Sequence, residues 1–168
     1  MHLTNAQKLA VLITLTVTVG TFVTTITIAN VSLPQLQGAF AATQDQITWI
    51  ITATLVAQAI ATPLSGWLDN KFGRRRILLI CATSFTSFSI LCGLASTLEE
   101  LVVWRFFQGL SGAPLVPLSQ AILVTIYPKE QHGKVLVFWM FGPIIGSLLA
   151  PLVGGFISED YSWRWVFM

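Results

Sequence analysis

The sequence predicts an all-α integral membrane protein with five complete transmembrane helices and the start of a sixth. Of its 168 residues, 54% are hydrophobic and only 10% are charged, whereas a typical soluble domain has about 25% charged residues. The mean hydropathy is +0.75, and the apolar residues gather in stretches as long as a membrane-spanning helix, about 20 residues. This composition excludes a disordered chain, a soluble enzyme and a nucleic-acid binder that relies on a basic surface.

The complete spans are expected at roughly 9–30, 47–67, 77–97, 101–127 and 135–157, and a sixth begins at Trp163. Each complete stretch is longer than a transmembrane β-strand, which has about ten residues, and none alternates strictly between apolar and polar residues. A helix satisfies its own backbone hydrogen bonds in lipid. Helices are therefore expected in all five stretches.

The basic residues predict a cytoplasmic N-terminus. Seven of the nine Lys and Arg residues fall on the side of the N-terminus when the spans alternate in direction: Lys8, Lys71, Arg74, Arg75, Arg76, Lys129 and Lys134. Lys and Arg that flank short loops stay on the cytoplasmic side of the membrane. We expect a multi-pass protein with its N-terminus in the cytoplasm.

No cofactor, metal site or enzymatic centre is expected. Cys81 and Cys92 both fall inside one apolar stretch, which does not suggest a disulfide framework or a metal site. His2 and His132 both lie outside the predicted spans, and no Ser/His/Asp arrangement or His/Cys/carboxylate cluster is visible.

Polar residues on the first two spans raise the possibility of a cavity. Thr14, Thr18, Thr21 and Thr25 lie within about 60° of one another on a helix, so they form one stripe. The stripe faces either a cavity or lipid, because a threonine hydroxyl can also bond back to its own helix. Gln58 in the second span needs a partner helix, water or a ligand, because an amide has more hydrogen-bonding groups than its backbone can satisfy.

The fourth span contains Arg105 about one turn inside its outer end. Gln108, Gly109 and Gly112 follow at i+3, i+4 and i+7 and share its face. The cation can either reach outward to the interface or point into the bundle as a functional charge. Because its face carries glycines, we favour the inward direction.

The fifth span carries small residues at successive i+4 positions, Gly142, Gly146, Ala150 and Gly154. Such a ridge lets another helix approach closely. Two interleaved prolines, Pro143 and Pro151, predict a bend.

Together these features resemble the major facilitator superfamily, in particular the EmrB/QacA type of multidrug efflux permease with about 14 spans. Residues 66–76 are similar to the family's signature between the second and third spans, Gly-x-x-x-Asp-Arg-x-Gly-Arg-Arg. Arg105, Gln108, Gly109 and Gly112 resemble its fourth-span motif. Gly146, Ala150-Pro151 and Gly154-Gly155 resemble its fifth-span antiporter motif, and Asn30-Val31-Ser32-Leu33-Pro34 resembles the box that ends its first span.

The resemblance implies the N-terminal part of a major facilitator bundle, in which residues 1–168 form a partial six-helix half. It implies proton-coupled antiport of hydrophobic or amphipathic compounds across the bacterial inner membrane, with a periplasmic adaptor and an outer-membrane channel as partners. The coupling or cavity residues would be Arg105, Gln108, Thr21, Thr25, Asn30 and Gln58. A cytoplasmic gating loop would use Gly66, Asp69, Asn70, Gly73, Arg74 and Arg75, and the bending helix of the antiporter motif would use Gly146, Pro151, Gly154 and Gly155.

Three departures from the family pattern bear on these expectations. Aligned on Asn30, Thr25 stands where relatives have an acidic residue, and no predicted span contains another carboxylate. Asn70 stands at the loop aspartate position, with Asp69 one place earlier, and Ala150 replaces a glycine. Threonine does not titrate usefully and arginine stays protonated, so neither can carry the coupled proton. Together with the short chain, this leaves an alternative: a truncated or degenerate membrane protein that transports nothing and at most associates with a full-length transporter.

Overall fold

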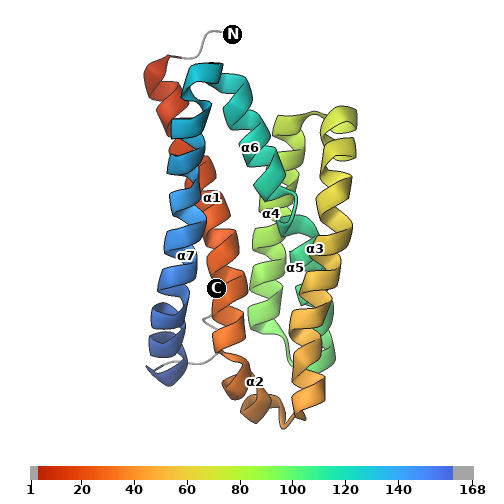
Figure 1. Cartoon of the computed structure of the whole chain (residues 1–168). Helices are drawn as coiled ribbons and strands as arrows, with labels where there is room; N and C mark the ends of the chain where they lie inside the picture. The colour runs from red at the N-terminus through yellow and green to blue at the C-terminus, as the bar shows by residue number, and fades with distance from the viewer. Residues whose placement is uncertain (1–3, 161–168) are drawn as a thin grey trace.

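The computed structural model describes residues 4–160, which form helices and short connections (Figure 1). The helices are α1 (Asn5–Val31), α2 (Leu33–Phe40), α3 (Gln44–Phe72), α4 (Arg74–Leu94), α5 (Leu98–Gly112), α6 (Leu115–Ile126), a short 3-10 turn η1 (Lys129–Gln131) and α7 (His132–Asp160). Five segments are long and apolar enough to cross a membrane when α5 and α6 are taken as one. The predicted all-α class with five spans is confirmed, and the expected sixth span from Trp163 lies outside the described residues.

The helix starts follow from local sequence. At Thr4, the hydroxyl accepts a hydrogen bond from the Gln7 backbone N–H while the Gln7 side chain accepts one from the Thr4 N–H. The same reciprocal arrangement joins Thr43 and Gln46 at the start of α3. Each pair satisfies two backbone donors that a helix N-terminus leaves free. Both long helices thus begin at a signal that the sequence carries locally.

The end of the first span contains an element that the sequence analysis did not predict. α1 ends at Val31, Ser32 caps it, and the short helix α2 follows directly with Pro34 in its first turn. Proline suits that position because its missing N–H would have no helical partner there. Leu36 of α2 is fully buried. The Asn30–Pro34 box is therefore a junction between two helices.

The predicted fourth span is interrupted. α5 ends at Gly112 and α6 begins at Leu115. Pro114 and Pro117 have no backbone N–H to donate to the carbonyls four residues earlier, so regular hydrogen bonding breaks here. Both prolines lie inside the expected span 101–127, and its apolar length alone does not reveal the break.

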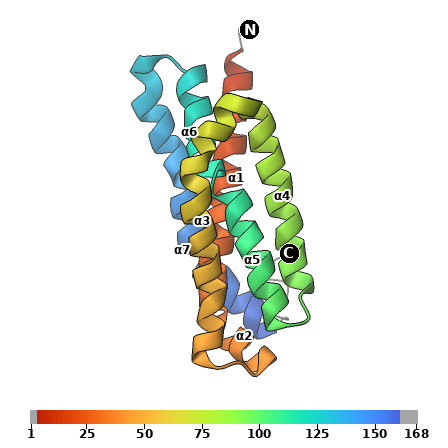
Figure 2. The same ribbon diagram turned by 90° about the vertical axis from the view of Figure 1, so that its right-hand side faces the viewer.

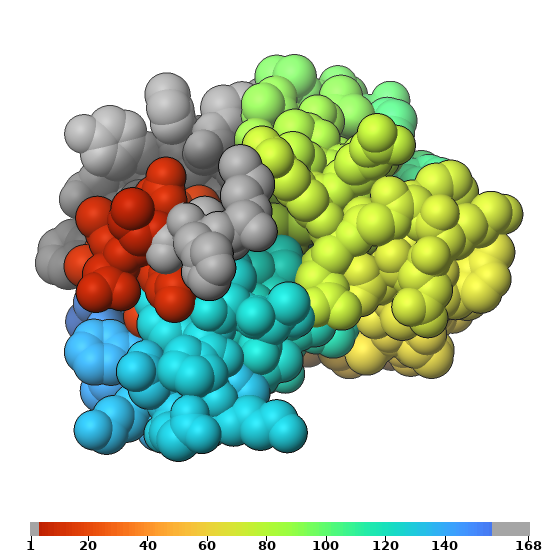
Figure 3. Space-filling view, turned by 90° about the horizontal axis from the view of Figure 1, so that it is seen from above, coloured from red at the N-terminus to blue at the C-terminus, as the bar shows by residue number. Residues whose placement is uncertain are grey.

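The bundle is organised around two sets of helices. α1 packs mainly on α7, and α5 packs on both α3 and α4, an arrangement that is also visible in Figure 1 and, after a quarter turn, in Figure 2. The start of α1, the α3–α4 connection and the α6–α7 connection lie at one end of the bundle (Figure 3), and α2 and the α4–α5 connection lie at the other (Figure 1). This end-to-end separation is the one that the charge-based topology requires, and the direction of the N-terminus stays a prediction.

The small-residue ridge of α7 lies against α1. A Cβ on Gly142 would collide with the carbonyl oxygen of Thr16, and one on Gly146 would lie 2.5 Å from Thr24 Oγ1. Thr16 and Thr24 do not belong to the polar stripe of α1. In the structure they lie against Gly142 and Gly146 of α7. Glycine is needed at both α7 positions because the two backbones come this close. α7 continues without interruption through Pro143 and Pro151, so the predicted bend stays a prediction.

Candidate functional site

The fourth-span arginine is buried inside the bundle. Arg105 is only 2% exposed, and its NH1 group donates a hydrogen bond to Gln108 Oε1 at 3.0 Å. A side chain that reached outward to the interface would be exposed and would leave Gln108 behind. The geometry therefore favours the inward alternative of the two that the sequence left open.

Gln108 is also held by residues of the neighbouring helix α4. Its Nε2 donates to the hydroxyl of Ser89 on α4 at 3.0 Å, and the thiol of Cys92 lies 3.9 Å from its Oε1. Both α4 residues are buried. Sequence reasoning missed Ser89. Its signal was its place on the stripe Ile77, Cys81, Phe85, Ser89 and Cys92, which is the buried face of α4.

α3 completes the surroundings of Arg105 at close range. A Cβ on Gly109 would lie only 2.7 Å from the carbonyl oxygen of Thr54. Thr54 Oγ1 donates to the Ile50 carbonyl at 2.9 Å and lies 3.4 Å from the Arg105 carbonyl oxygen. Gly109, four residues after Arg105, thus has a structural role, because its missing side chain lets α3 and α5 come into contact.

Arg105 is one of the residues that line a small cavity of about 90 Å³. Its lining comes from α1, α3 and α5: Ile26, Ala29, Asn30, Ile50, Ile51, Thr54, Leu55 and Arg105. This volume holds about three water molecules at their liquid volume. One charge and one amide within mostly apolar walls suit a site that orients a proton-carrying or polar group in an apolar setting. Arg105 and Asn30, predicted separately, therefore meet at one place.

Three other predicted cavity residues do not line that cavity. Thr21 is exposed and Thr25 is half-buried, and their hydroxyls donate to the carbonyls of Val17 and Thr21 at 2.9 and 2.8 Å. Gln58 is half-buried, and its Nε2 has no hydrogen-bond partner among the residues that the structure describes. The hydroxyls of the threonine stripe therefore donate to carbonyls of their own helix. A role of the stripe in a wider cavity stays a prediction.

The predicted cytoplasmic gating loop is mostly helical. α3 runs to Phe72 and α4 starts at Arg74, so Gly73 alone connects them. Its φ of +83° lies in the region that favours glycine. Gly66, by contrast, lies inside α3, which corrects the expectation that it belongs to a loop. The helix α3 therefore continues through Gly66 to Phe72.

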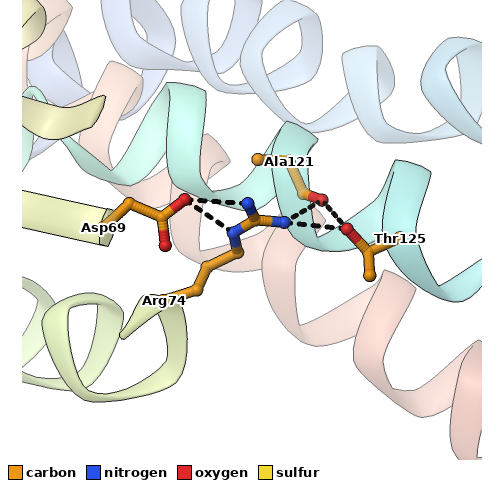
Figure 4. A network of polar contacts seen from close by, with 4 residues as sticks. All are labelled: Asp69, Arg74, Ala121 and Thr125. Atoms are coloured by element: carbon orange, nitrogen blue, oxygen red, sulfur yellow. Dashed lines mark hydrogen bonds and ion pairs between the residues drawn. The ribbon is translucent and has the colours of Figure 1, made fainter. Parts of the chain in front are cut away.

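Arg74 ties the ends of three helices together (Figure 4). Its NH2 and Nε groups lie 2.8 and 2.9 Å from Asp69 Oδ2 on α3. Its NH1 donates to the carbonyl of Ala121 and the hydroxyl of Thr125 on α6, at 2.7 and 2.8 Å. Asp69, one place before the family's aspartate position, thus takes the ion pair, while Asn70 is exposed.

We expect Arg74→Ala to destabilise the bundle by about 1–2 kcal/mol, because hydrogen bonds to a charged group contribute more than neutral ones and partial exposure reduces the gain. Arg75 provides the matched control, since it is the exposed neighbour on the same turn. Arg75→Ala should stay within about 0.5 kcal/mol of the parent. The midpoint of thermal unfolding in detergent measures both, and equal midpoints for the two variants would contradict a structural role for Arg74.

The predicted antiporter-motif residues divide into two groups. Gly146 and Gly154 face α1, where a Cβ on Gly154 would lie 2.6 Å from Ile28 Cγ1. Pro151 is exposed, and a Cβ on Gly155 would meet nothing within 4 Å. In residues 4–160, no group of three His, Cys, Asp or Glu side chains gathers where it could hold a metal ion.

Comparison with protein families and with curated proteins gives consistent matches. The model of the Major Facilitator Superfamily matches residues 14–168. The chain is 40% identical over 159 residues to the multidrug export protein EmrB of Haemophilus influenzae, which covers 94% of this chain and 31% of that protein. It is 39% identical over 141 residues to the fatty acid resistance protein FarB of Neisseria gonorrhoeae, covering 84% of this chain and 28% of FarB. The chain thus spans about a third of the length of these curated relatives.

Solved structures share the fold. The proton:xylose symporter XylE bound to 6-bromo-6-deoxy-D-glucose superposes with a TM-score of 0.85 at 21% identity, over 96% of this chain and 41% of that one. A bacterial homologue of the human lysosomal transporter Spinster gives a TM-score of 0.81 at 20% identity, over 98% of this chain and 37% of that one. At these identities the likeness concerns the fold alone.

Proposed function

The chain belongs to the major facilitator superfamily, and from this premise we propose that it forms part of a longer permease that exports hydrophobic or amphipathic compounds by proton-coupled antiport. The observation that carries the proposal is Arg105, a buried cation that faces a small cavity between α1, α3 and α5. Ionisable residues inside membrane spans are expensive and mark transport pathways. The relatives named for multidrug export and fatty acid resistance support small amphipathic substrates.

The expected spans contain no carboxylate, and this bears on which part of the permease binds the coupled proton. No Asp or Glu lies within the expected spans 9–30, 47–67, 77–97, 101–127 or 135–157. Thr25 stands at the family's acidic position and bonds back to its own helix. We propose that the rest of the permease supplies the proton-binding carboxylate and that Arg105 provides the positive field which favours its ionised form.

The setting of the permease follows from the same premise. Its five apolar spans make it a multi-pass membrane protein. We propose the bacterial inner membrane, with the N-terminus in the cytoplasm because the basic residues gather on that side. An adaptor in the periplasm and a channel in the outer membrane would complete the export route. The bundle here would be most of the N-terminal six-helix half.

An alternative is favoured by Thr25 alone. A chain that has lost the carboxylate has no titratable group of its own in the membrane, so it would act as a non-transporting partner of a full-length transporter. Export by a permease that contains this chain, driven by a proton gradient, would exclude this alternative. Co-purification of the chain with another transporter, without any change in export, would support it.

The test uses the full-length gene expressed in a strain that lacks its own efflux pumps. We expect faster loss of an amphipathic dye when a proton gradient is imposed, and no such loss when the gradient is collapsed. Single cysteines at Thr21, Thr25 and Gln58 test the cavity assignment through labelling by a water-soluble reagent. The control is Leu148→Cys on α7, a position 70% exposed on the apolar surface. Labelling at the three positions no faster than at Leu148 would contradict the cavity assignment.

A further inference from the structure

Ser89 is a buried hydroxyl at the contact between α4 and α5. It is on α4, only 9% exposed, and it meets the side chain of Gln108 on α5. Ser87, two residues earlier, is exposed and donates to the carbonyl of Thr83 at 2.9 Å, as serines commonly do on a helix surface. Ser89 differs from Ser87 because its hydroxyl also accepts a hydrogen bond from a side chain of a neighbouring helix.

The chemistry of an amide makes the hydroxyl of Ser89 matter for Arg105. A guanidinium has donors only, so Gln108 has to present Oε1 to Arg105 NH1, as it does at 3.0 Å. Nε2 then points the opposite way, toward α4, and needs an acceptor. The Ser89 hydroxyl is that acceptor at 3.0 Å. Removing it would leave a buried amide N–H without this partner and free Gln108 to rotate.

The direction of the guanidinium depends on Gln108 in turn. Arg105 starts about one turn inside the outer end of its span, within reach of the interface. The Oε1 acceptor lies inside the bundle, and Arg105 lines the cavity together with Asn30 and Thr54. Each link is a hydrogen bond between buried side chains, so a change at α4 reaches a cavity that α4 does not line.

We propose that Ser89 is a positioning residue: it orients the Gln108 amide, and the amide keeps the Arg105 guanidinium directed into the cavity between α1, α3 and α5. Cys92, whose thiol lies 3.9 Å from the same Oε1, adds a weak second donor and does not replace the Ser89 contact. The inference deepens the proposed function, on which its transport consequence rests. Its electrostatic consequence can be measured without transport.

The test measures the electrostatic potential in the cavity through the reactivity of a cysteine placed at position 55. Leu55 lines the cavity and is 55% exposed. The full-length permease carrying Leu55→Cys is treated with an anionic and a cationic methanethiosulfonate reagent of similar size, and the two rate constants are divided. A nearby guanidinium speeds the anionic reagent and slows the cationic one. The permease without the engineered cysteine gives the background from Cys81 and Cys92.

We expect Ser89→Ala to lower the anionic-to-cationic ratio by about threefold or more, because the guanidinium moves away from the cavity. Arg105→Gln should lower it further and defines the value without the charge. Ser87→Ala, the matched control, should leave the ratio unchanged, and Ser89→Thr should restore it because the hydroxyl returns. Thermal unfolding of each variant identifies any that fails to fold, and in that case Ser89→Cys, a weak acceptor of similar size, takes the place of alanine.

Two results would overturn the proposal. One is an unchanged ratio in folded Ser89→Ala or Ser89→Cys. The other is an unchanged ratio in Arg105→Gln, since the guanidinium would then not set the cavity potential. A permease that moves no dye, yet shows the expected ratios, would contradict the proposed function and leave the positioning role of Ser89 in place.

Discussion

A Gly142→Val variant should fail to assemble a stable bundle, with a loss of about 3 kcal/mol or more in the free energy of unfolding. The new Cβ would collide with the carbonyl oxygen of Thr16, which belongs to the backbone of α1. A side chain can rotate away from such a contact, whereas a backbone carbonyl cannot move unless the whole helix shifts. Separating α1 from α7 would remove the most extensive helix contact of the described bundle.

Gly155→Ala on the same helix is the matched control, because its Cβ would meet nothing within 4 Å. Alanine is also the better helix former, so this variant should be as stable as the parent or slightly more stable. Folded yield and the midpoint of unfolding in a graded detergent mixture measure both. A Gly142→Val protein as stable as the parent would show that α1 and α7 do not approach as closely as described.

Replacing Arg105 by methionine is expected to reduce export by about tenfold or more, with little loss of folded protein. A buried charge costs desolvation free energy, so an apolar side chain of similar length is tolerated in the fold. What is lost is the positive charge beside the cavity, and Gln108 Oε1 loses its strongest donor. Arg105→Lys keeps a charge without the planar fork and should retain part of the rate.

The rate of dye export from energised cells, divided by the amount of folded permease, measures this effect. Arg76→Met removes one exposed charge in the first turn of α4 and serves as the control. It should keep nearly full export. If Arg105→Met exported as fast as Arg76→Met, the proposed role of the buried cation in transport would be wrong.

Local features of this protein were predictable because they depend on composition along the chain. The stretches 9–30 and 77–97 lie largely within α1 and α4 because a long apolar run in lipid has to be helical. Elsewhere, apolar length alone did not predict where the helices end. The stretch 101–127 contains Pro114 and Pro117, and the helix breaks beside them. The family resemblance implied a loop from Gly66, whereas α3 continues to Phe72.

The candidate site was predictable only in part. Arg105 and Gln108 stood out because a charge and an amide are costly in a membrane span. Ser89 did not stand out, since a serine is a common residue and its importance comes from the side chain that it meets. Likewise, nothing in the sequence singles out Thr16 and Thr24, whereas in the structure both lie against glycines of α7.

By itself, the sequence determined that the chain is a helical membrane protein, where its spans lie and which family its motifs resemble. Hydropathy, span length and motif spacing are all read along one chain, so no neighbour is needed to interpret them. Only the tertiary structure decided that Arg105 turns inward, that Asp69 pairs with Arg74, and that Ser89 holds Gln108. Periodicity shows which residues share a helix face, but the partner of that face depends on how each helix rotates and on which helix packs against it.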